Sequence, residues 1–186
     1  MKGVLRRFKD DERIVLWDLY NEPGNNHLPD QVFPLVKKVF QWAREINPTQ
    51  PVTVGIWRRQ REFQEVIDFC LNNSDIISFH NYGAYEGMAK DIANFKSYGK
   101  PLVCSEYLAR GNNSTFETIL PLLQREQVAA INWGFVDGKT QTKYPWNHPL
   151  NVIAIEPWHH EIYQKDGTPY RQSEVALIQQ LTGRAN

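Results

Sequence analysis

Two glutamates, Glu22 and Glu106, each lie where an apolar, strand-like run gives way to a loop. Glu22 stands in the sequence Asn-Glu-Pro-Gly after the run 14–20, and Glu106 lies near the end of the run 101–107. A pair of carboxyl groups suits the cleavage of an acetal, because one must be protonated to help the leaving group depart while the other must be ionised to attack or stabilise the positive sugar carbon. The two residues therefore predict acid–base and nucleophilic chemistry on a glycosidic bond.

A third strand-like run contributes His80 and Tyr82. Side chains alternate across a strand, so these two residues share one face. With the two glutamates, they place polar, titratable groups at or near the carboxyl ends of three different strands, which is the edge where sites assemble in parallel α/β folds. Asp18 shares a face with Glu22, and there we expect it to have structural partners and no catalytic role.

The elements that must position these residues form a regular alternation. Five short runs are apolar almost without interruption, as is typical of strands buried on both faces; they are 14–20, 51–57, 75–82, 101–107 and 129–135. Apolar residues at helical spacing fill the intervals and the two ends of the chain, namely 1–13, 30–47, 61–73, 87–99, 114–127 and 173–183. This alternation predicts an α/β fold with a parallel sheet and helices outside it.

Four short motifs follow the predicted strands in order: NEP (21–23), HNY (80–82), SE (105–106) and NWG (132–134). In this order and on these elements they resemble the retaining glycoside hydrolases of clan A, most closely family five, the cellulase and mannanase family. The resemblance covers nearly the whole chain. It implies that the five strands are numbers four to eight of a (β/α)8 TIM barrel.

The resemblance also implies roles for single residues. Glu22 would be the general acid and base, and its neighbour Asn21 would hold the sugar 2-hydroxyl. Glu106 would be the nucleophile, with Tyr82 hydrogen-bonded to it. His80 would support the acid and the substrate, although from the residues alone a histidine of the core fits this position equally well.

Tryptophans supply the expected apolar contacts with the sugar. The resemblance implies that Trp133 forms the floor under the sugar being cleaved. Trp57, at the end of its strand, either binds a neighbouring sugar unit or caps the core. Trp146 and Trp158 either wall the substrate or pack within the long irregular stretch 136–172, whose length is typical of a functional connection.

The chain departs from the family pattern at its N-terminal end. Barrels of this family carry strands one to three before the NEP strand, whereas only about one helix precedes Glu22 here. Five strands cannot close an eight-stranded barrel. We therefore expect residues 1–186 to be one partial catalytic domain, the C-terminal part of a longer, secreted or periplasmic parent whose activity the isolated fragment can lack.

Composition excludes several partner classes. Lys plus Arg is 21 and Asp plus Glu is 21, so a formal charge of zero argues against a dedicated nucleic-acid binder. No segment has eighteen consecutive apolar residues, so we expect no membrane span. Cys70 and Cys104 are expected to be unpaired thiols. We expect a carbohydrate substrate and no cofactor, and the composition leaves the oligomeric state open.

Two other functions fit parts of the pattern. A non-catalytic, carbohydrate-binding remnant would keep the aromatic platforms without turnover. A metal-dependent hydrolase would use histidine and carboxylate ligands, and the sequence WHHE (158–161) suggests such a site. Adjacent histidines point in different directions in regular structure, so we expect no metal there. The four ordered motifs favour the retaining glycosidase.

Overall fold

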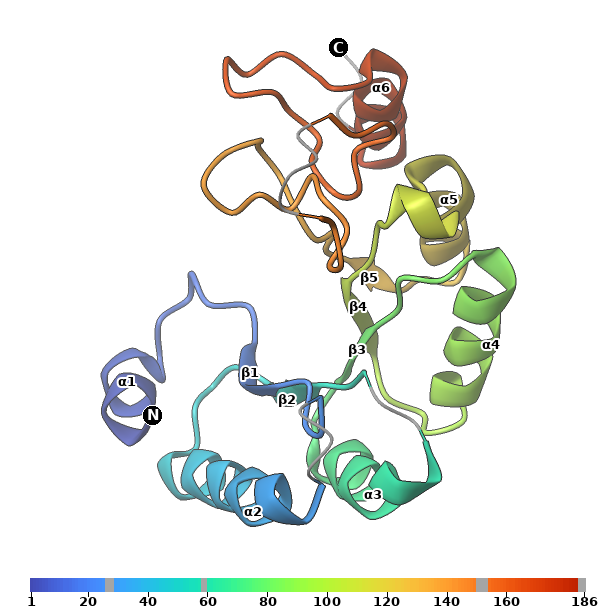
Figure 1. The fold of residues 1–186 in the computed structure, drawn as a ribbon. Helices are drawn as coiled ribbons and strands as arrows, with labels where there is room; N and C mark the ends of the chain where they lie inside the picture. The colour runs from blue at the N-terminus through green and yellow to red at the C-terminus, as the bar shows by residue number, and fades with distance from the viewer. Residues whose placement is uncertain (26–28, 58–59, 150–153, 184–186) are drawn as a thin grey trace. The chain divides into compact units, whose positions relative to one another are not determined.

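The computed structural model describes residues 1–25, 29–57, 60–149 and 154–183 and divides into two compact units. The first unit comprises Met1–His80 and Phe95–Val103, and the second comprises Asn81–Asn94 and Cys104–Asn186. Strands and helices alternate along the chain, as Figure 1 shows.

Parallel pairing organises the strands of the first unit. β1 (Trp17–Asn21) and β2 (Val52–Gly55) are parallel, with Trp17 opposite Val52 and a register irregularity between Asp18 and Asn21. Ile56, directly after β2, bridges in parallel to Phe79 of β3 (Ile77–His80). Every residue of β2 and β3 is buried, including the polar residues Thr53, Ser78 and His80, as the nearly continuous apolar character of the two runs predicted.

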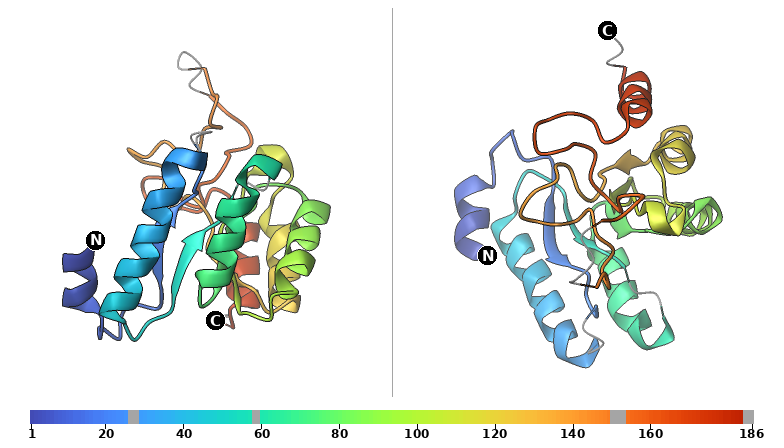
Figure 2. Two further views of the ribbon diagram at one scale, coloured as in Figure 1. Left: turned by 90° about the horizontal axis from the view of Figure 1, so that it is seen from below. Right: turned by 45° about the horizontal axis from the view of Figure 1, so that its top comes forward.

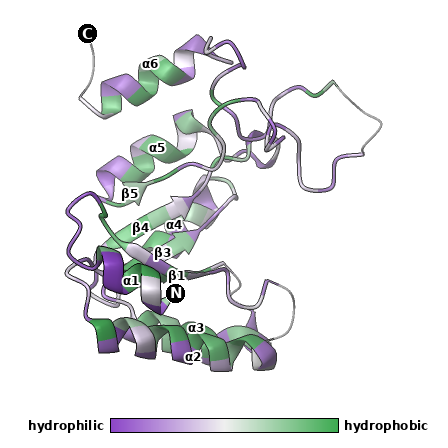
Figure 3. Ribbon diagram, turned by 90° about the vertical axis from the view of Figure 1, so that its left-hand side faces the viewer, coloured by the Kyte–Doolittle hydropathy of each residue, from purple (hydrophilic) through white to green (hydrophobic). Residues whose placement is uncertain are grey.

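Helices cover the apolar strands of the first unit. They are α1 (Lys2–Phe8), α2 (Pro29–Ile46), the short 3₁₀ helix η1 (Arg61–Phe63) and α3 (Gln64–Asn73). α2 contacts both α1 and α3, and the helices lie side by side in Figure 2. Hydropathy alternates along α2 and α3 in Figure 3, because each helix buries one face and exposes the other. Arg44 of α2 donates to both carboxylate oxygens of Asp75, at 2.8 and 2.9 Å, and so fixes the segment before β3.

The second unit holds most of α4 (Tyr85–Lys96), the end of β4 (Leu102–Glu106), η2 (Arg110–Asn112), α5 (Phe116–Arg125), β5 (Ala129–Ala130) and α6 (Gln172–Leu181). The backbone N–H of Ile131 donates to Cys104, and that of Trp133 donates to Tyr107. Since both partners advance along the chain in the same direction, this pairing is parallel. The predicted α/β fold of parallel strands and helices is thereby confirmed.

A buried ion pair joins separate elements of the second unit. Arg110 donates to the two carboxylate oxygens of Glu174 at 2.8 and 2.5 Å, and the two side chains are 1% and 0% exposed. Arg110 also donates to the carbonyl oxygen of Trp158 at 3.0 Å. The same guanidinium therefore ties η2 to α6 and to the long irregular segment between β5 and α6.

The expectation of a buried strand over 129–135 is wrong. β5 contains Ala129 and Ala130 alone, and both are exposed. Ile131 and Phe135 are 54% and 63% exposed. Gly134 ends the extended path with a φ of +85°, and β5 pairs with β4 on one side only in the part of the chain that the structure describes. An apolar run gives no indication of whether a second strand covers its other edge.

Two smaller expectations can be compared directly. Cys70 and Cys104 are both buried thiols outside any disulfide, as expected. None of the described helices is long and apolar enough to cross a membrane.

Candidate active site

Glu22 and His80 form the polar pair of the first unit. Glu22 follows β1, and His80 is the last residue of β3. The Nδ1 atom of His80 lies 2.8 Å from Oε1 of Glu22, and His80 is buried. The other carboxylate oxygen accepts a hydrogen bond from the side-chain amide of Asn25 at 2.6 Å. Both oxygens of this glutamate are thus held by neighbours.

The backbone of Glu22 has a strained conformation. Its φ is +48°, a left-handed conformation that costs a non-glycine residue about 1 to 2 kcal/mol. The N–H of Glu22 donates to the carbonyl oxygen of Gly55 at 3.0 Å, which anchors the turn to β2. Strain of this kind persists only where the surroundings determine the conformation, and it gathers at functional sites.

Gly55 leaves the space in which the histidine ring sits. A Cβ atom at this position would stand 2.8 Å from Nε2 of His80 and 2.9 Å from Oδ2 of Asp18. Such distances are shorter than van der Waals contact, so a larger residue would displace the ring. The carboxylate of Asp18 accepts from the N–H of Gly55 at 3.1 Å and from that of Tyr20 at 3.2 Å, so Asp18 has the structural partners expected of it.

Glu106 and Tyr82 form the corresponding pair of the second unit. The Tyr82 hydroxyl donates to Oε2 of Glu106 at 2.5 Å. The backbone between them is joined as well, since the N–H of Asn81 donates to the carbonyl oxygen of Glu106 at 3.0 Å. The Asn81 side chain donates to buried Asp91 and accepts from the N–H of Gly83 at 2.8 Å. These bonds fix the turn that carries Tyr82.

The segment after Glu106 is strained and buried. Leu108 has a φ of +78° and is fully buried. Its carbonyl oxygen accepts a hydrogen bond from Nδ1 of His160, which lies 52 residues further along the chain. This contact anchors the long segment between β5 and α6 two residues away from the glutamate.

The remaining residues predicted for the site divide between the units. Asn21 and Trp57 lie in the first unit, where Asn21 is exposed at the end of β1 and Trp57 is half-buried after β2. Trp133 lies in the second unit, exposed, with its N–H bonded to the carbonyl oxygen of Tyr107 at 2.9 Å. The structure thus brings His80 to Glu22 and Tyr82 to Glu106, as the resemblance implied. The catalytic and sugar-binding roles stay predictions.

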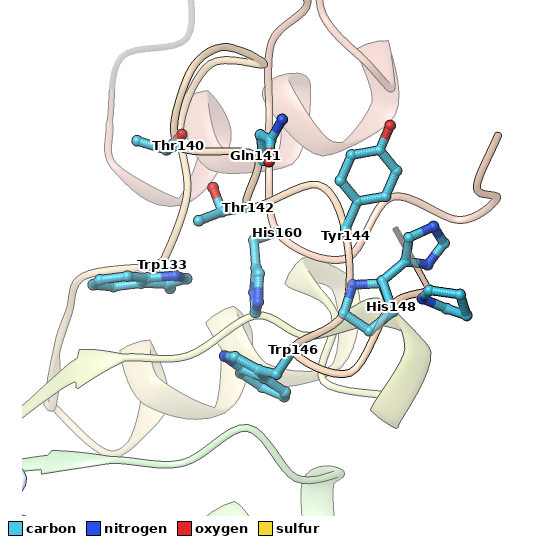
Figure 4. A pocket seen from close by; sticks show the side chains of 10 residues that line it. Trp133, Thr140, Gln141, Thr142, Tyr144, Trp146, His148 and His160 are labelled. Atoms are coloured by element: carbon cyan, nitrogen blue, oxygen red, sulfur yellow. The ribbon is translucent and has the colours of Figure 1, made fainter. Parts of the chain in front are cut away.

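The second unit also contains a cavity that the sequence did not predict. It has a volume of about 620 Å³, and Trp133, Thr142, Tyr144, Trp146 and His160 are among its lining residues (Figure 4). Trp146, for which the sequence left two interpretations open, is 58% exposed at this cavity. The available signal was a stretch rich in aromatic, hydroxyl and amide side chains directly after the last predicted strand.

The comparison with protein families decides the assignment. The model of the cellulase family, glycosyl hydrolase family 5, matches residues 1–138, a range that contains all four motifs. The chain belongs to glycosyl hydrolase family 5. The resemblance to clan A glycoside hydrolases inferred from the motifs is therefore confirmed.

Curated relatives of this family 5 chain include mammalian β-glucuronidases. The human enzyme (Homo sapiens) is 31% identical over 115 residues, which are 58% of the chain and 17% of that enzyme. The rat enzyme (Rattus norvegicus) is 28% identical over 180 residues, which are 92% of the chain and 26% of that enzyme. The chain thus spans about a quarter or less of the length of these two relatives.

Solved glycosidase structures share the fold of this family 5 chain. The β-glucuronidase of Faecalibacterium prausnitzii matches 99% of the chain and 34% of its own, with a TM-score of 0.63 and 18% identity. A family 10 endo-β-1,4-xylanase from Gloeophyllum trabeum matches 99% of the chain and 65% of its own, with a TM-score of 0.60 and 15% identity. At these identities the likeness shows the fold alone.

Proposed function

We propose that this family 5 chain supplies the two catalytic carboxylates of a retaining β-glycosidase that degrades a plant or microbial polysaccharide. Family membership supports glycoside hydrolysis. The observation that carries the proposal is that the two glutamates have different and chemically suited partners. Glu22 is paired with an imidazole, and Glu106 is paired with a phenol.

The partner of Glu22 suits a residue that must gain and lose a proton. An ionised Glu22 accepts a hydrogen from Nδ1–H of His80, whereas a protonated Glu22 donates to the bare nitrogen of the other tautomer. The 2.8 Å contact therefore survives in both states. A general acid that becomes a general base in the second step needs this tolerance.

The partner of Glu106 suits a nucleophile. A phenolic hydroxyl donates its hydrogen to a carboxylate, and a hydrogen bond to the charged form favours that form. The 2.5 Å bond from Tyr82 also fixes the orientation of the carboxylate that would attack the sugar carbon. We propose that Asn21, Trp133 and Trp57 bind the sugar around this pair.

The proposal includes an incomplete barrel. We infer that the chain provides strands four to eight and that a longer protein provides the rest, which agrees with the small share of the curated relatives that it spans. A retaining mechanism requires the carboxyl groups of Glu22 and Glu106 to lie about 5 to 5.5 Å apart, against about 6.5 to 9.5 Å in an inverting enzyme.

Rescue by azide tests the roles in the protein that carries residues 1–186. Glu106→Ala should abolish hydrolysis, and azide should restore cleavage with a product of inverted configuration. Glu22→Ala should still react with a good leaving group such as 2,4-dinitrophenolate, because little protonation is needed, and azide should then release a product of retained configuration. A retained product from Glu106→Ala, or full activity of either variant, would show that the roles are wrong.

A further inference from the structure

One carboxylate of α4 faces the turn that carries Tyr82. Asp91 is 8% exposed, and its Oδ2 atom accepts a hydrogen bond from the side-chain amide of Asn81, which is 7% exposed. Both residues lie in the second unit together with Tyr82 and Glu106. A carboxylate that is taken out of water costs free energy unless hydrogen-bond donors meet it, so the burial of Asp91 requires partners such as this amide.

Asn81 links α4 both to the turn and to the end of β4. Its amide nitrogen donates to Asp91, and its amide oxygen accepts from the backbone N–H of Gly83 at 2.8 Å. Its own backbone N–H donates to the carbonyl oxygen of Glu106 at 3.0 Å. Since Tyr82 stands between Asn81 and Gly83 in the sequence, these bonds hold its backbone on both sides.

The bonding partners determine which way round the Asn81 amide lies. A backbone N–H only donates, so the amide oxygen must face Gly83 and the amide nitrogen is directed at Asp91. Without the acceptor at position 91, this buried nitrogen would lose a partner, at a cost in free energy that turning the amide away would relieve. The carboxylate of Asp91 therefore stabilises the amide orientation on which the bond to Gly83 depends.

The hydroxyl of Tyr82 is sensitive to the backbone that carries it. It lies at the far end of the side chain, so a rotation of the backbone at residue 82 displaces it more than the atoms near the backbone. It donates to Oε2 of Glu106 at 2.5 Å, and a hydrogen bond weakens steeply when its angle departs from a straight line. Bonds that fix the backbone on both sides of Tyr82 therefore help to keep this contact.

We propose that Asp91 is a positioning residue for the proposed reaction: through Asn81, it holds the Tyr82 hydroxyl on Glu106. The proposal rests on the proposed function, in which Glu106 is the nucleophile. Asp91 acts without touching the sugar, since its partner is a buried amide. A displacement of about 1 Å that arises far from the reacting atoms can cost about 100-fold in rate, so a residue of α4 is able to influence the reaction in this way.

The test measures kcat and KM for a p-nitrophenyl β-glycoside that the protein carrying residues 1–186 cleaves. Asp91→Ala removes the acceptor, so kcat should fall about tenfold while KM stays within about twofold of wild type. Asp91→Asn keeps an acceptor oxygen for the Asn81 amide and should recover most of the lost kcat. Asp166→Ala removes an exposed carboxylate of the same unit, and it should leave both constants unchanged.

The variant Tyr82→Phe shows whether Asp91 acts through Tyr82. Once the hydroxyl is gone, adding Asp91→Ala should lower kcat by less than about twofold, because residues that act as a unit have non-additive effects. An equal loss in both backgrounds, an unchanged kcat in Asp91→Ala, or no recovery in Asp91→Asn would overturn the proposal.

Circular dichroism checks the fold of each variant. If Asp91→Ala does not fold, Asp91→Leu takes its place, because leucine fills the space of the carboxylate and accepts no hydrogen bond. Failure of both variants to fold would show that Asp91 supports the unit as a whole, which would also overturn the proposal.

Fluorine NMR of the protein labelled with 3-fluorotyrosine separates this proposal from the catalytic function. The Tyr82 signal is identified by its loss in Tyr82→Phe. It should move in Asp91→Ala and stay near its wild-type position in Asp91→Asn. This pattern in a protein that hydrolyses no glycoside would uphold the positioning of Tyr82 and refute the catalytic function. An unmoved signal in an Asp91→Ala variant with wild-type hydrolysis would support the catalytic function and overturn the positioning.

Discussion

The substitution Tyr82→Phe tests how far the proposed reaction depends on the hydrogen bond between Tyr82 and Glu106. Tyr82→Phe deletes one oxygen atom and keeps the ring, whose edge contacts with Trp146 and His160 have centroid separations of 4.8 and 5.6 Å. The substitution therefore leaves the packing of the site in place. Its effect on catalysis should come from the lost 2.5 Å hydrogen bond.

The size of the effect follows from the charge of the acceptor. A hydrogen bond to a charged group contributes about 1.5 to 3 kcal/mol, roughly twice a neutral one. The bond exists before substrate binds, so kcat/KM falls only by the part of this contribution that positions Glu106 for attack. If all of it does so, kcat/KM should fall by about 10- to 150-fold, since each 1.36 kcal/mol is tenfold. Glu106→Ala should cost far more, because it removes the attacking atom itself.

The assay is kcat/KM on a p-nitrophenyl β-glycoside that the wild-type protein cleaves. Tyr163→Phe, which removes a phenolic hydroxyl elsewhere in the same unit, is the matched control and should retain wild-type activity. A Tyr82→Phe variant within twofold of wild type would refute the reasoning, because the hydrogen bond would then contribute nothing to catalysis. A loss equal to that of Glu106→Ala would also refute it, because Tyr82 would then act directly in the reaction.

Three further predictions concern stability and the site's geometry. Glu174→Gln leaves the Arg110 charge buried without its ion-pair partner, so the free energy of unfolding in a urea titration should fall by about 3 to 5 kcal/mol. Glu45→Gln, which breaks an exposed pair with Lys2, is the control and should change the free energy of unfolding far less. Burial lowers the pKa of His160 to about 4, whereas the pKa of a histidine in the unfolded chain is near 6.5, so the contribution of neutral His160 to stability is present above pH 6.5 and is lost as pH falls toward 4. The free energy of unfolding, measured by urea titration, should therefore differ less between pH 7 and pH 4.5 in His160→Asn than in wild type. Gly55→Ala places a Cβ atom 2.8 Å from Nε2 of His80 and should displace the histidine ring. Hydrolysis should then fall at least about tenfold while the circular dichroism spectrum stays unchanged. A wild-type kcat/KM would contradict the argument that Gly55 positions His80.

The parts of the fold that follow local rules could be predicted from the sequence. Val52–Gly55 and Ile77–His80 are buried at every position, and a nearly continuous apolar run is typical of strands covered on both faces. The same rule failed for residues 129–135, because burial there depends on a partner strand that local sequence does not specify. The run is apolar in both cases, and only tertiary context separates them.

The two glutamate contacts were implied by family resemblance, whereas the cavity beside Trp146 was not. His80 is the last residue of β3 and Tyr82 follows two residues later, so the end of the predicted strand and side-chain parity indicate both positions. The cavity wall instead depends on a contact between His160 and Leu108 across 52 residues of mostly irregular chain. Irregular segments have no periodicity from which such a contact can be inferred.

Both strand ends that carry the candidate carboxylates contain strained backbone, and positive φ also occurs at four described non-glycine residues elsewhere, Asn47, Asn113, Gln127 and Gln141. Glu22 has a φ of +48°, and Leu108, two residues after Glu106, has a φ of +78°. Each such conformation costs on the order of 1 to 3 kcal/mol, which the fold must offset elsewhere. The offset is visible in both places, as the bond from Glu22 to Gly55 and the bond from His160 to Leu108. Under the proposed function, these turns would place the two carboxylates for chemistry, as strained turns do at other functional sites.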